Sequence, residues 1–340
     1  MSEPVPTDRI RVFDKSGYPV TEFNAAFDRS WAINEEGRGE FKLATRDTVL
    51  CSENNFRYGN WILVENSILP PWVGMLDTPR HSSALEMTFA AYTPEHLFSQ
   101  RIAPIDQTNN YDPGGWFRWF IGFSNTVSLT ILQVGTIYHD NDKISKQVCP
   151  RYLSEYLKDI IEESAQEYEF VPQINNGRLS IVGNWAQTLG VDTQAMLTSE
   201  AGNIEAGDPL ITDDGPLAND IFVFGDGASW ASRPRAKAWD QENIARYGIR
   251  HFVHEATGVT KKSTLQTIAN NMLAKMKLGV KVLSLNAINT GNIFQSLKNG
   301  NRLNARLTSS DFGYYGKARI TGMSYEPLIP NKVALVMEVV

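Results

Sequence analysis

The sequence predicts a mainly β protein: two β units of barrel or sandwich type, with a small mixed α/β insertion between them. Three observations predict this fold. Short alternating segments fill residues 9–92, an amphipathic helix over residues 150–168 precedes two strands, and the C-terminal segment is a series of strands behind one helix. The domains that follow are 1–103 for the first β unit, 104–218 for the insertion and 219–340 for the second β unit.

The first β unit is predicted from its strands and from the turns between them. Residues 30–34 and 40–44 are joined by five residues that include two glycines, as in a β-hairpin. The apolar segments 60–65, 71–77 and 85–92 are each bounded by Gly, Pro, Asn or Ser, which favour turns. About six strands with hardly any helical period favour a closed or sandwiched antiparallel sheet.

The boundary with the insertion is a short helix predicted up to residue 103, since Pro94 is tolerated in a first helical turn. The main helix of the insertion, residues 150–168, is apolar on one face and charged on the other, so we expect it to pack on a sheet. Strands 168–174 and 178–185, joined by an Asn-Asn-Gly turn, are predicted to provide that sheet.

The second β unit contains one strong helix, predicted over residues 263–278, where Ser263 is a good N-cap and Gly279 ends the pattern. Strands are predicted on both sides of this helix. They are residues 220–225, 236–240, 250–255, 281–287, 302–308, 317–326 and 332–340.

The histidines and cysteines do not form a convincing metal site. His251 and His254 are three residues apart, but residues 250–255 are predicted to form a strand, in which these two side chains point to opposite faces. The spacing of Cys51 and Cys149 matches neither a metal site nor a redox pair. The sequence therefore predicts no metal ligands.

Motifs for phosphate, calcium and nucleophilic chemistry are also absent from the sequence. Gly225-Asp226-Gly227 lacks the third glycine and the helix of a dinucleotide-binding loop. The acidic segments 140–142 and 213–215 lack the spacing of a calcium loop, and no Gly-x-Ser-x-Gly occurs. The sequence thus predicts no catalytic residue, no cofactor and no enzymatic activity.

The charge balance is acidic: 32 Lys and Arg against 38 Asp and Glu give a net charge of −6. Such a chain repels nucleic acid, so general DNA binding is not expected. The N-terminus lacks the basic and apolar segments of a secretory signal, and no segment reaches the about 20 apolar residues of a membrane span. We expect a soluble protein, made in a cytoplasm and without stable membrane insertion.

The densest aromatic cluster of the chain follows a Pro-Gly-Gly turn, and two interpretations of it stay open. Tryptophan offers flat apolar area to a sugar or lipid, whereas a wedge buried in a core or in a subunit contact is the interpretation we favour. Aromatic residues and arginine are enriched at protein interfaces. The residues of this candidate interaction surface are Trp116, Phe117, Arg118, Trp119, Phe120 and Phe123.

A family resemblance spreads over most of the chain. It rests on an aromatic-led hairpin with a glycine-rich turn, on its return strands, on a short helix that ends in an aromatic-glycine pair, and on the closing helix and strands. These segments are residues 30–43, 58–62, 72–77, 242–250, 263–278, 299–303 and 318–325. In this order they resemble the tail-hub, or baseplate hub, proteins of long-tailed bacteriophages, of the siphovirus type with tail-tube-like barrels.

The resemblance implies a structural virion protein with two tail-tube-like barrels per chain. Such a hub is a homotrimer that joins the tail tube to the tail tip or baseplate and forms part of the channel for DNA. The implied partners are further copies of the chain, the tail tube or distal tail protein, tip or fibre proteins and the tape measure protein, with DNA only passing through. The implied location is the phage tail tip, after assembly in the host cytoplasm.

Two other classes of function stay open. A tail-tip enzyme that degrades the cell wall needs paired carboxylates in a cleft, and Glu162, Glu163, Asp213 and Asp214 are the candidates. A receptor-binding or glycan-binding tail protein would use the exposed faces of Trp116 and Trp119.

Overall fold

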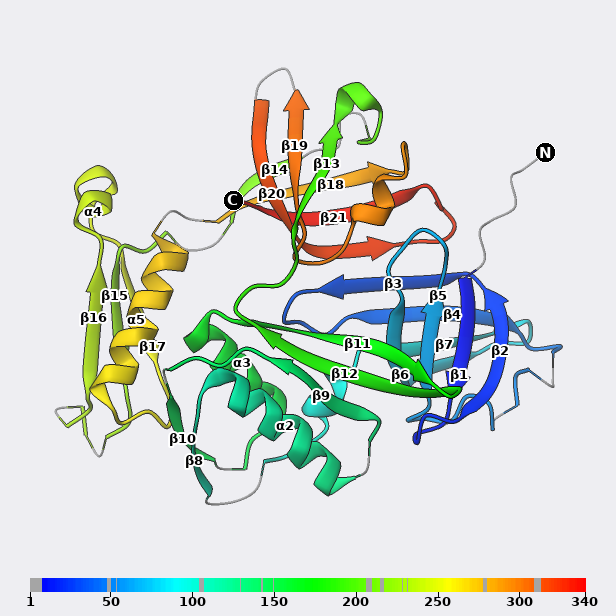
Figure 1. Ribbon diagram of the computed structural model, residues 1–340, viewed down its shortest axis with the longest axis horizontal. Coiled ribbons are helices and arrows are strands. Elements are labelled where there is room, and N and C mark those ends of the chain that lie inside the picture. Colours follow the sequence, from blue (N-terminus) through cyan, green and yellow to red (C-terminus); the bar gives the residue numbers. More distant parts are fainter. Residues whose placement is uncertain are drawn as a thin grey trace.

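A computed structural model describes most of the chain. The described residues are 8–47, 50–52, 54–103, 107–128, 130–141, 143–148, 150–205, 210–214, 217–227, 229–230, 232–277, 280–308 and 313–340. The predicted fold class is confirmed: the molecule is mainly β, with few helices and a small mixed insertion (Figure 1).

The first β unit is a curved antiparallel sheet around its own core. Its strands follow the path β3-β4-β7-β6-β5-β1-β2 through the sheet, and β2 is an edge strand. Aromatic rings fill the inner face, where Phe41 stacks on Phe89 with ring centroids 5.0 Å apart. The strands are β1 (Asp8–Phe13), β2 (Pro19–Ala25), β3 (Phe27–Ala32), β4 (Arg38–Ala44), β5 (Trp61–Glu65), β6 (Trp72–Ser82) and β7 (Glu86–Tyr92).

The insertion covers the outer face of this sheet at β5 and β6. Trp61 and Leu63 pack outward against the insertion, while Ile62 and Val64 point into the core of the first unit. Because β5 is buried on both faces, its apolar residues run without alternation. The insertion contains α1 (His96–Ser99), β8 (Gln107–Tyr111), α2 (Pro113–Val127), β9 (Leu132–Ile137), β10 (Ile144–Val148), α3 (Leu153–Ser164), β11 (Glu167–Asn175) and β12 (Arg178–Ala186).

The C-terminal β unit continues the sheet of the first unit. The end of β20 pairs with β3, so that Tyr325 lies opposite Arg29 and Gly322 opposite Ala32. This pairing joins the strands of both units into one sheet (Figure 1). The strands of this unit are β13 (Asp192–Thr198), β14 (Leu210–Asp214), β18 (Val280–Ile288), β19 (Arg302–Thr308), β20 (Gly313–Tyr325) and β21 (Lys332–Val339), with the short 3-10 helices η1 (Ser199–Ala201) and η2 (Ile293–Ser296).

The unit boundaries differ from the predicted domains 104–218 and 219–340. β13 and β14 precede residue 218 but pair with β19 and β18 of the C-terminal unit. Residues 220–276, in turn, form a separate lobe. The reason is that strand partners distant in sequence leave no local pattern, so a linear division cannot find them.

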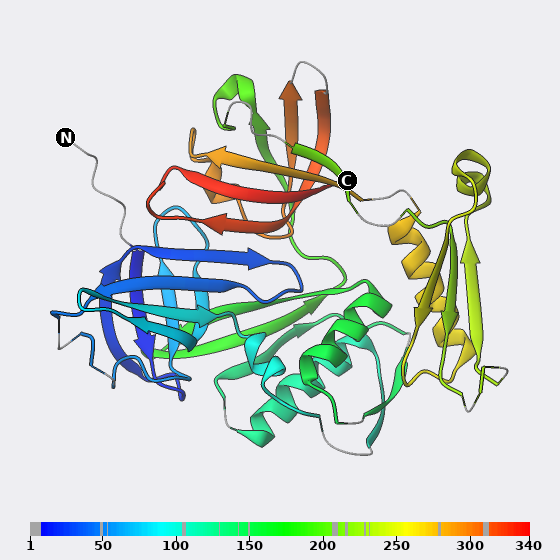
Figure 2. The same ribbon diagram turned by 180° about the vertical axis from the view of Figure 1, so that it is seen from behind.

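The separate lobe is a three-stranded sheet with a helix on one face, and it lies at one end of the molecule (Figure 2). The strand order is β16-β15-β17, and Leu265, Ile268 and Ala269 of the helix α5 pack into its core. The predicted helix 263–278 therefore belongs to this lobe. The lobe contains β15 (Asp220–Phe224), β16 (Arg235–Trp239), α4 (Gln241–Tyr247), β17 (His251–Glu255) and α5 (Lys262–Met276).

Candidate functional site

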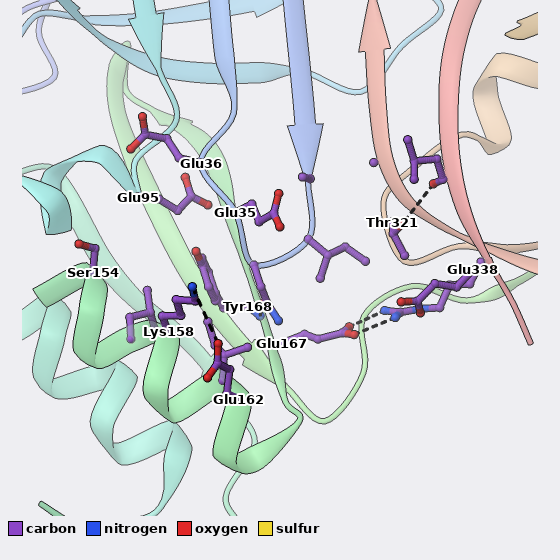
Figure 3. Close-up of a pocket in the computed structure, with 18 of the residues that line it drawn as sticks. Glu35, Glu36, Glu95, Ser154, Lys158, Glu162, Glu167, Tyr168, Thr321 and Glu338 are labelled. Atoms are coloured by element: carbon purple, nitrogen blue, oxygen red, sulfur yellow. Dashed lines mark hydrogen bonds and ion pairs between the residues drawn. The ribbon is translucent and has the colours of Figure 1, made fainter. Parts of the chain in front are cut away.

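A cavity of about 780 Å³ lies where the parts of the chain meet. The β3–β4 turn of the first unit, helix α3 and strand β11 of the insertion, strands β20 and β21 of the C-terminal unit, and the end of α5 all contribute to its wall (Figure 3). We call it the junction cavity. No single segment lines the cavity alone, so the cavity forms only when the whole chain has folded.

Carboxylates outnumber cations in the junction cavity. Lys158 lies 4.0 Å from Glu162, and Arg319 pairs with Glu167. The carboxylates that line the cavity are Glu35, Glu36, Glu95, Glu162, Glu167 and Glu338, and the cations are Lys158, Lys275 and Arg319. The surplus makes the cavity a site of negative potential that favours a cationic partner.

Glu95 has one carboxylate oxygen that is shielded from solvent in this cavity. Its Oε2 atom is buried and has no hydrogen-bond partner among the described residues. Burial raises the pKa of Glu95 to about 7, although a hydrogen bond from Thr93 acts in the opposite direction. The same burial, together with the charges of Glu95 and Glu36, raises the pKa of the neighbouring Tyr168. A carboxyl group with so high a pKa can hold or release a proton near neutral pH.

A histidine bridge closes the rim beside Glu36. The His96 ring lies 3.0 Å from Glu36 Oε2 through Nδ1 and 3.0 Å from Asp77 Oδ2 through Nε2, and it stacks on Tyr92 with ring centroids 4.5 Å apart. Burial lowers the pKa of His96, but the hydrogen bonds and charges of the two carboxylates outweigh it, so that the pKa is raised overall. In its protonated form the ring can donate to both carboxylates, and it thus joins α1 to β6 and to the β3–β4 turn.

The wall of the cavity is held by two further links. Asn34 adopts a left-handed backbone with φ 60°, and its side-chain amide donates to Gln166 O at 3.1 Å and accepts from Tyr168 N at 3.0 Å. The Arg319 guanidinium binds both carboxylate oxygens of Glu167, one of them at 2.8 Å, and both residues are buried. A bidentate pair of this kind fixes orientation as well as distance.

A smaller cavity of about 290 Å³ adjoins the first one and shares Glu35, Glu95 and Tyr168 with it. The rest of its lining is largely apolar, with Trp31 and Pro172 among the residues. The two cavities therefore form an acidic hollow with an apolar extension.

The candidate interaction surface divides between the core and the surface of α2. Trp116, Phe117 and Phe120 are each 0 % exposed. They pack in the insertion core, where the Trp116 indole donates to Ile144 O at 2.9 Å. These three rings cannot contact a partner, and Trp116 offers no exposed face to a glycan. Trp119 and Phe123 are half-buried and stacked 5.4 Å apart, and Arg118 is exposed. That Arg118, Trp119 and Phe123 form an interaction surface stays a prediction.

The four candidate carboxylates of a wall-degrading enzyme do not gather in one cleft. Glu162 lines the junction cavity, whereas Glu163 points into the core and pairs with Lys146 at 2.6 Å. Asp213 and Asp214 end β14, and their side chains lie outside the described residues. Glu162 and Glu163 are separated because adjacent residues of a helix such as α3 face different directions.

The histidines and cysteines are placed as follows. His251 and His254 lie in β17, on opposite faces, as predicted. Cys51 is a half-buried free thiol, and Cys149 lies outside the described residues. Within the described part of the chain, no three His, Cys, Asp or Glu side chains gather as metal ligands would. No helix in that part is long and apolar enough to span a bilayer.

Glu35, Glu36, Glu95 and His96 were not predicted as site residues from the sequence. Glu35 and Glu36 lie in the predicted hairpin turn, and an acidic pair in a turn indicates exposed carboxylates, because turns place side chains at the surface. Nothing local marked Glu95, since its neighbours in the cavity come from α3, β11 and β20.

Comparison with known proteins gives the fold. No protein-family model matches the chain, and no curated protein matches it. Among solved structures, the prophage tail protein gp18 from Listeria monocytogenes is similar over 97% of this chain and 94% of its own, with 13% identity and a TM-score of 0.61.

Two further structures agree with this match. The 43 kDa tail protein of prophage MuSo2 from Shewanella oneidensis covers 97% of this chain and 98% of its own, with 9% identity and a TM-score of 0.60. A tail protein from Neisseria meningitidis covers 97% and 96%, with 12% identity and a TM-score of 0.60. The chain therefore has, from end to end, a fold found in phage tail proteins.

Proposed function

We propose that this chain is a structural component of a bacteriophage tail, a trimeric hub that joins the tail tube to the tail tip or baseplate and forms part of the channel for DNA. The observation that carries the proposal is coverage. Three tail proteins match 97% of this chain and 94% to 98% of their own lengths. The likeness thus extends to the insertion and the lobe and is not limited to a common β unit.

The architecture supports a role that depends on shape. The two β units share one sheet through β3 and β20, so they form a continuous body to which neighbours can attach. In this proposal the partners are two further copies of the chain, the tail tube or distal tail protein, tip or fibre proteins and the tape measure protein. The protein is assembled in the host cytoplasm, resides in the virion, and needs no catalytic step.

The proposal is tested by the mass of the purified chain in solution. Light scattering over a concentration series should show a trimer of about three times 38.1 kDa, and negative-stain images should show a ring with a central hole. A compact monomer at every concentration, in the absence and in the presence of tail-tube protein, would contradict the trimeric hub.

One observation favours a second candidate, an enzyme that acts on the cell wall. Glu95, with a pKa that burial raises to about 7, lies in a hollow with other carboxyl groups, and a general acid beside a second carboxyl group is the arrangement that such enzymes use. Release of soluble fragments from dye-labelled peptidoglycan, abolished in Glu95→Gln, would support this candidate. No release by the purified chain above a buffer blank would remove it.

A further inference from the structure

Charge is segregated along the chain. Residues 219–277, which contain the lobe, carry nine Lys and Arg against five Asp and Glu, a surplus of four positive charges. The whole chain carries 32 against 38, so everything outside the lobe is negative by ten. A positive lobe on a negative body attracts the body of another copy, because opposite fields steer and orient association.

The lobe also presents an uncovered sheet face. Helix α5 packs on the inner face, where Ala236 and Ala238 of β16 are buried. The alternate residues of that strand, Arg235, Lys237 and Trp239, therefore share the outer face. Both views place this face at one end of the molecule, away from the C-terminal β unit (Figures 1 and 2).

The outer face combines aromatic and cationic groups, and two of its cations are paired within the lobe: Lys237 with Asp220 at 3.0 Å and Arg233 with Glu255 at 3.3 Å. Trp239 is 56 % exposed, and the Lys237 ammonium lies 5.5 Å from the centre of its ring and 4.6 Å from that of Phe222. At the end of the face Trp230 is 65 % exposed, with the Arg233 guanidinium 4.7 Å from its ring centre. Tryptophan and arginine are the side chains that most often contribute strongly to protein interfaces.

The junction cavity is the complementary surface. Its six lining carboxylates exceed its three cations. Glu35 and Glu162 are exposed at its rim (Figure 3). Cationic side chains from outside would supply the hydrogen bonds and the charge that this hollow lacks.

We propose that the outer face of the lobe docks on the carboxylate-lined junction cavity of a second copy of this chain, in a head-to-tail contact. Two different faces meet in such a contact, and three repeats close a ring. The inference rests on the proposed trimer, and it names the two surfaces that hold the subunits of that trimer together. The occupant is a second copy because the chain itself carries both complementary charges.

The first test changes the lobe face alone. The double variant Arg235→Glu with Trp239→Ala alters two exposed side chains and leaves the buried alanines of β16 in place. We expect the midpoint of trimer assembly to rise about a hundredfold in concentration, as loss of a central interface contact predicts. The matched control, Lys15→Glu with Leu85→Ala, changes an exposed cation and an exposed apolar side chain on the first unit and should assemble like the wild type.

The second test uses complementation. Glu35→Lys with Glu162→Lys should impair the other face and raise the assembly midpoint in the same way, so that each variant alone is monomeric below its raised midpoint. Glu86→Lys with Glu326→Lys, on exposed acids elsewhere, should not. Mixed in equal amounts, the lobe variant and the cavity variant still share one intact pair of faces. We expect a dimer of about twice 38.1 kDa that does not close into a trimer.

The outcomes separate the two proposals. A wild-type trimer that survives in the lobe variant overturns this interface and leaves the hub standing. Two variants that are each monomeric and do not form a dimer when mixed overturn the pairing of these faces. The trimer itself is overturned if the wild-type protein stays monomeric and its lobe instead binds a column that carries an anionic glycan or single-stranded DNA.

Discussion

Individual charged residues hold the separate parts of this molecule together. Arg319 and Glu167 join β20 to β11, His96 joins α1 to two acidic positions of the first unit, and the buried pair Arg29 and Asp8 lies at 2.9 Å beside the β3–β20 contact. Each pair links segments that are distant in sequence. Buried charges are costly unless paired, so each link is formed only in the correctly assembled chain.

At the scale of residues, we predict that His96→Gln lowers stability more at pH 6 than at pH 8. The pKa of His96 is raised in the folded protein, so its contribution is fully present below the unfolded pKa of about 6.5 and is lost as pH rises through the folded pKa. We expect a loss of about 1 to 2 kcal/mol at pH 6. Urea unfolding at both pH values measures it.

The exposed His81 provides the control, and His81→Gln should change stability little at either pH. A loss in His96→Gln that is the same at pH 6 and pH 8 would show that the imidazolium does not act as the bridge.

Elements are joined by the same means, most clearly where the lobe meets the insertion. Lys146 of β10 lies 2.6 Å from Glu163 of α3 and 3.4 Å from the carbonyl oxygen of Thr257 in the lobe. Asn271 of α5 donates to Glu163 O at 3.0 Å. Burial raises the pKa of Glu163 to about 7, while Lys146 opposes this. One buried ion pair thus connects three elements.

At the scale of elements, we predict that Lys146→Met destabilises the protein by about 3 kcal/mol at pH 8, because it leaves a buried carboxylate without its partner. The loss should shrink at pH 5, where Glu163 is protonated. Adding Glu163→Gln should recover part of the stability at pH 8. Thermal or urea unfolding of the single and double variants measures these differences.

The control is Lys158→Met on α3, the helix that carries Glu163, since Lys158 is 76 % exposed and its pair with Glu162 contributes little. If Lys146→Met were no more destabilising than Lys158→Met, the buried pair would not be the link between the elements.

Elements with a regular pattern were predictable from the sequence, and elements with a mixed pattern were not. The stripe of α3 and the apolar pattern of α5 located both helices within a few residues, but Ser263 is not the N-cap that the sequence predicted, because α5 begins at Lys262 and Lys261 precedes it. Helix α2 was not predicted, because its three glycines and many aromatic rings are weak helix formers, and tertiary packing of Trp116 and Phe117 overrides that preference. Burial of β5 on two faces was likewise invisible, since it depends on the insertion.

The molecule as a whole is one sheet with a positive lobe attached to a negative body. The local pattern of strands in the first unit was predictable, and so was the mainly β fold. The junction cavity and the charge segregation were not found from the sequence, since the cavity needs segments about 300 residues apart, such as Glu35 and Glu338.

At the scale of the whole molecule, we predict that salt dissociates the proposed trimer. Raising NaCl from 0.05 to 0.5 M shortens the Debye length from about 14 Å to about 4 Å and screens attraction between lobe and body. We expect the assembly midpoint to rise at least about tenfold, measured by sedimentation equilibrium. A trimer that tightens with salt would indicate an apolar contact instead.

The pairing of β3 with β20 also determines when the sheet can be completed during synthesis. Residues 27–32 leave the ribosome long before residues 322–325, and at about 5 to 20 residues per second the interval is about 15 to 60 s. Throughout it, β3 presents an open edge that can pair with another nascent chain. Neighbouring ribosomes on one message would bring such edges together, so productive yield of this protein depends on how rapidly its final strands are translated and on chaperones that cover the edge until then.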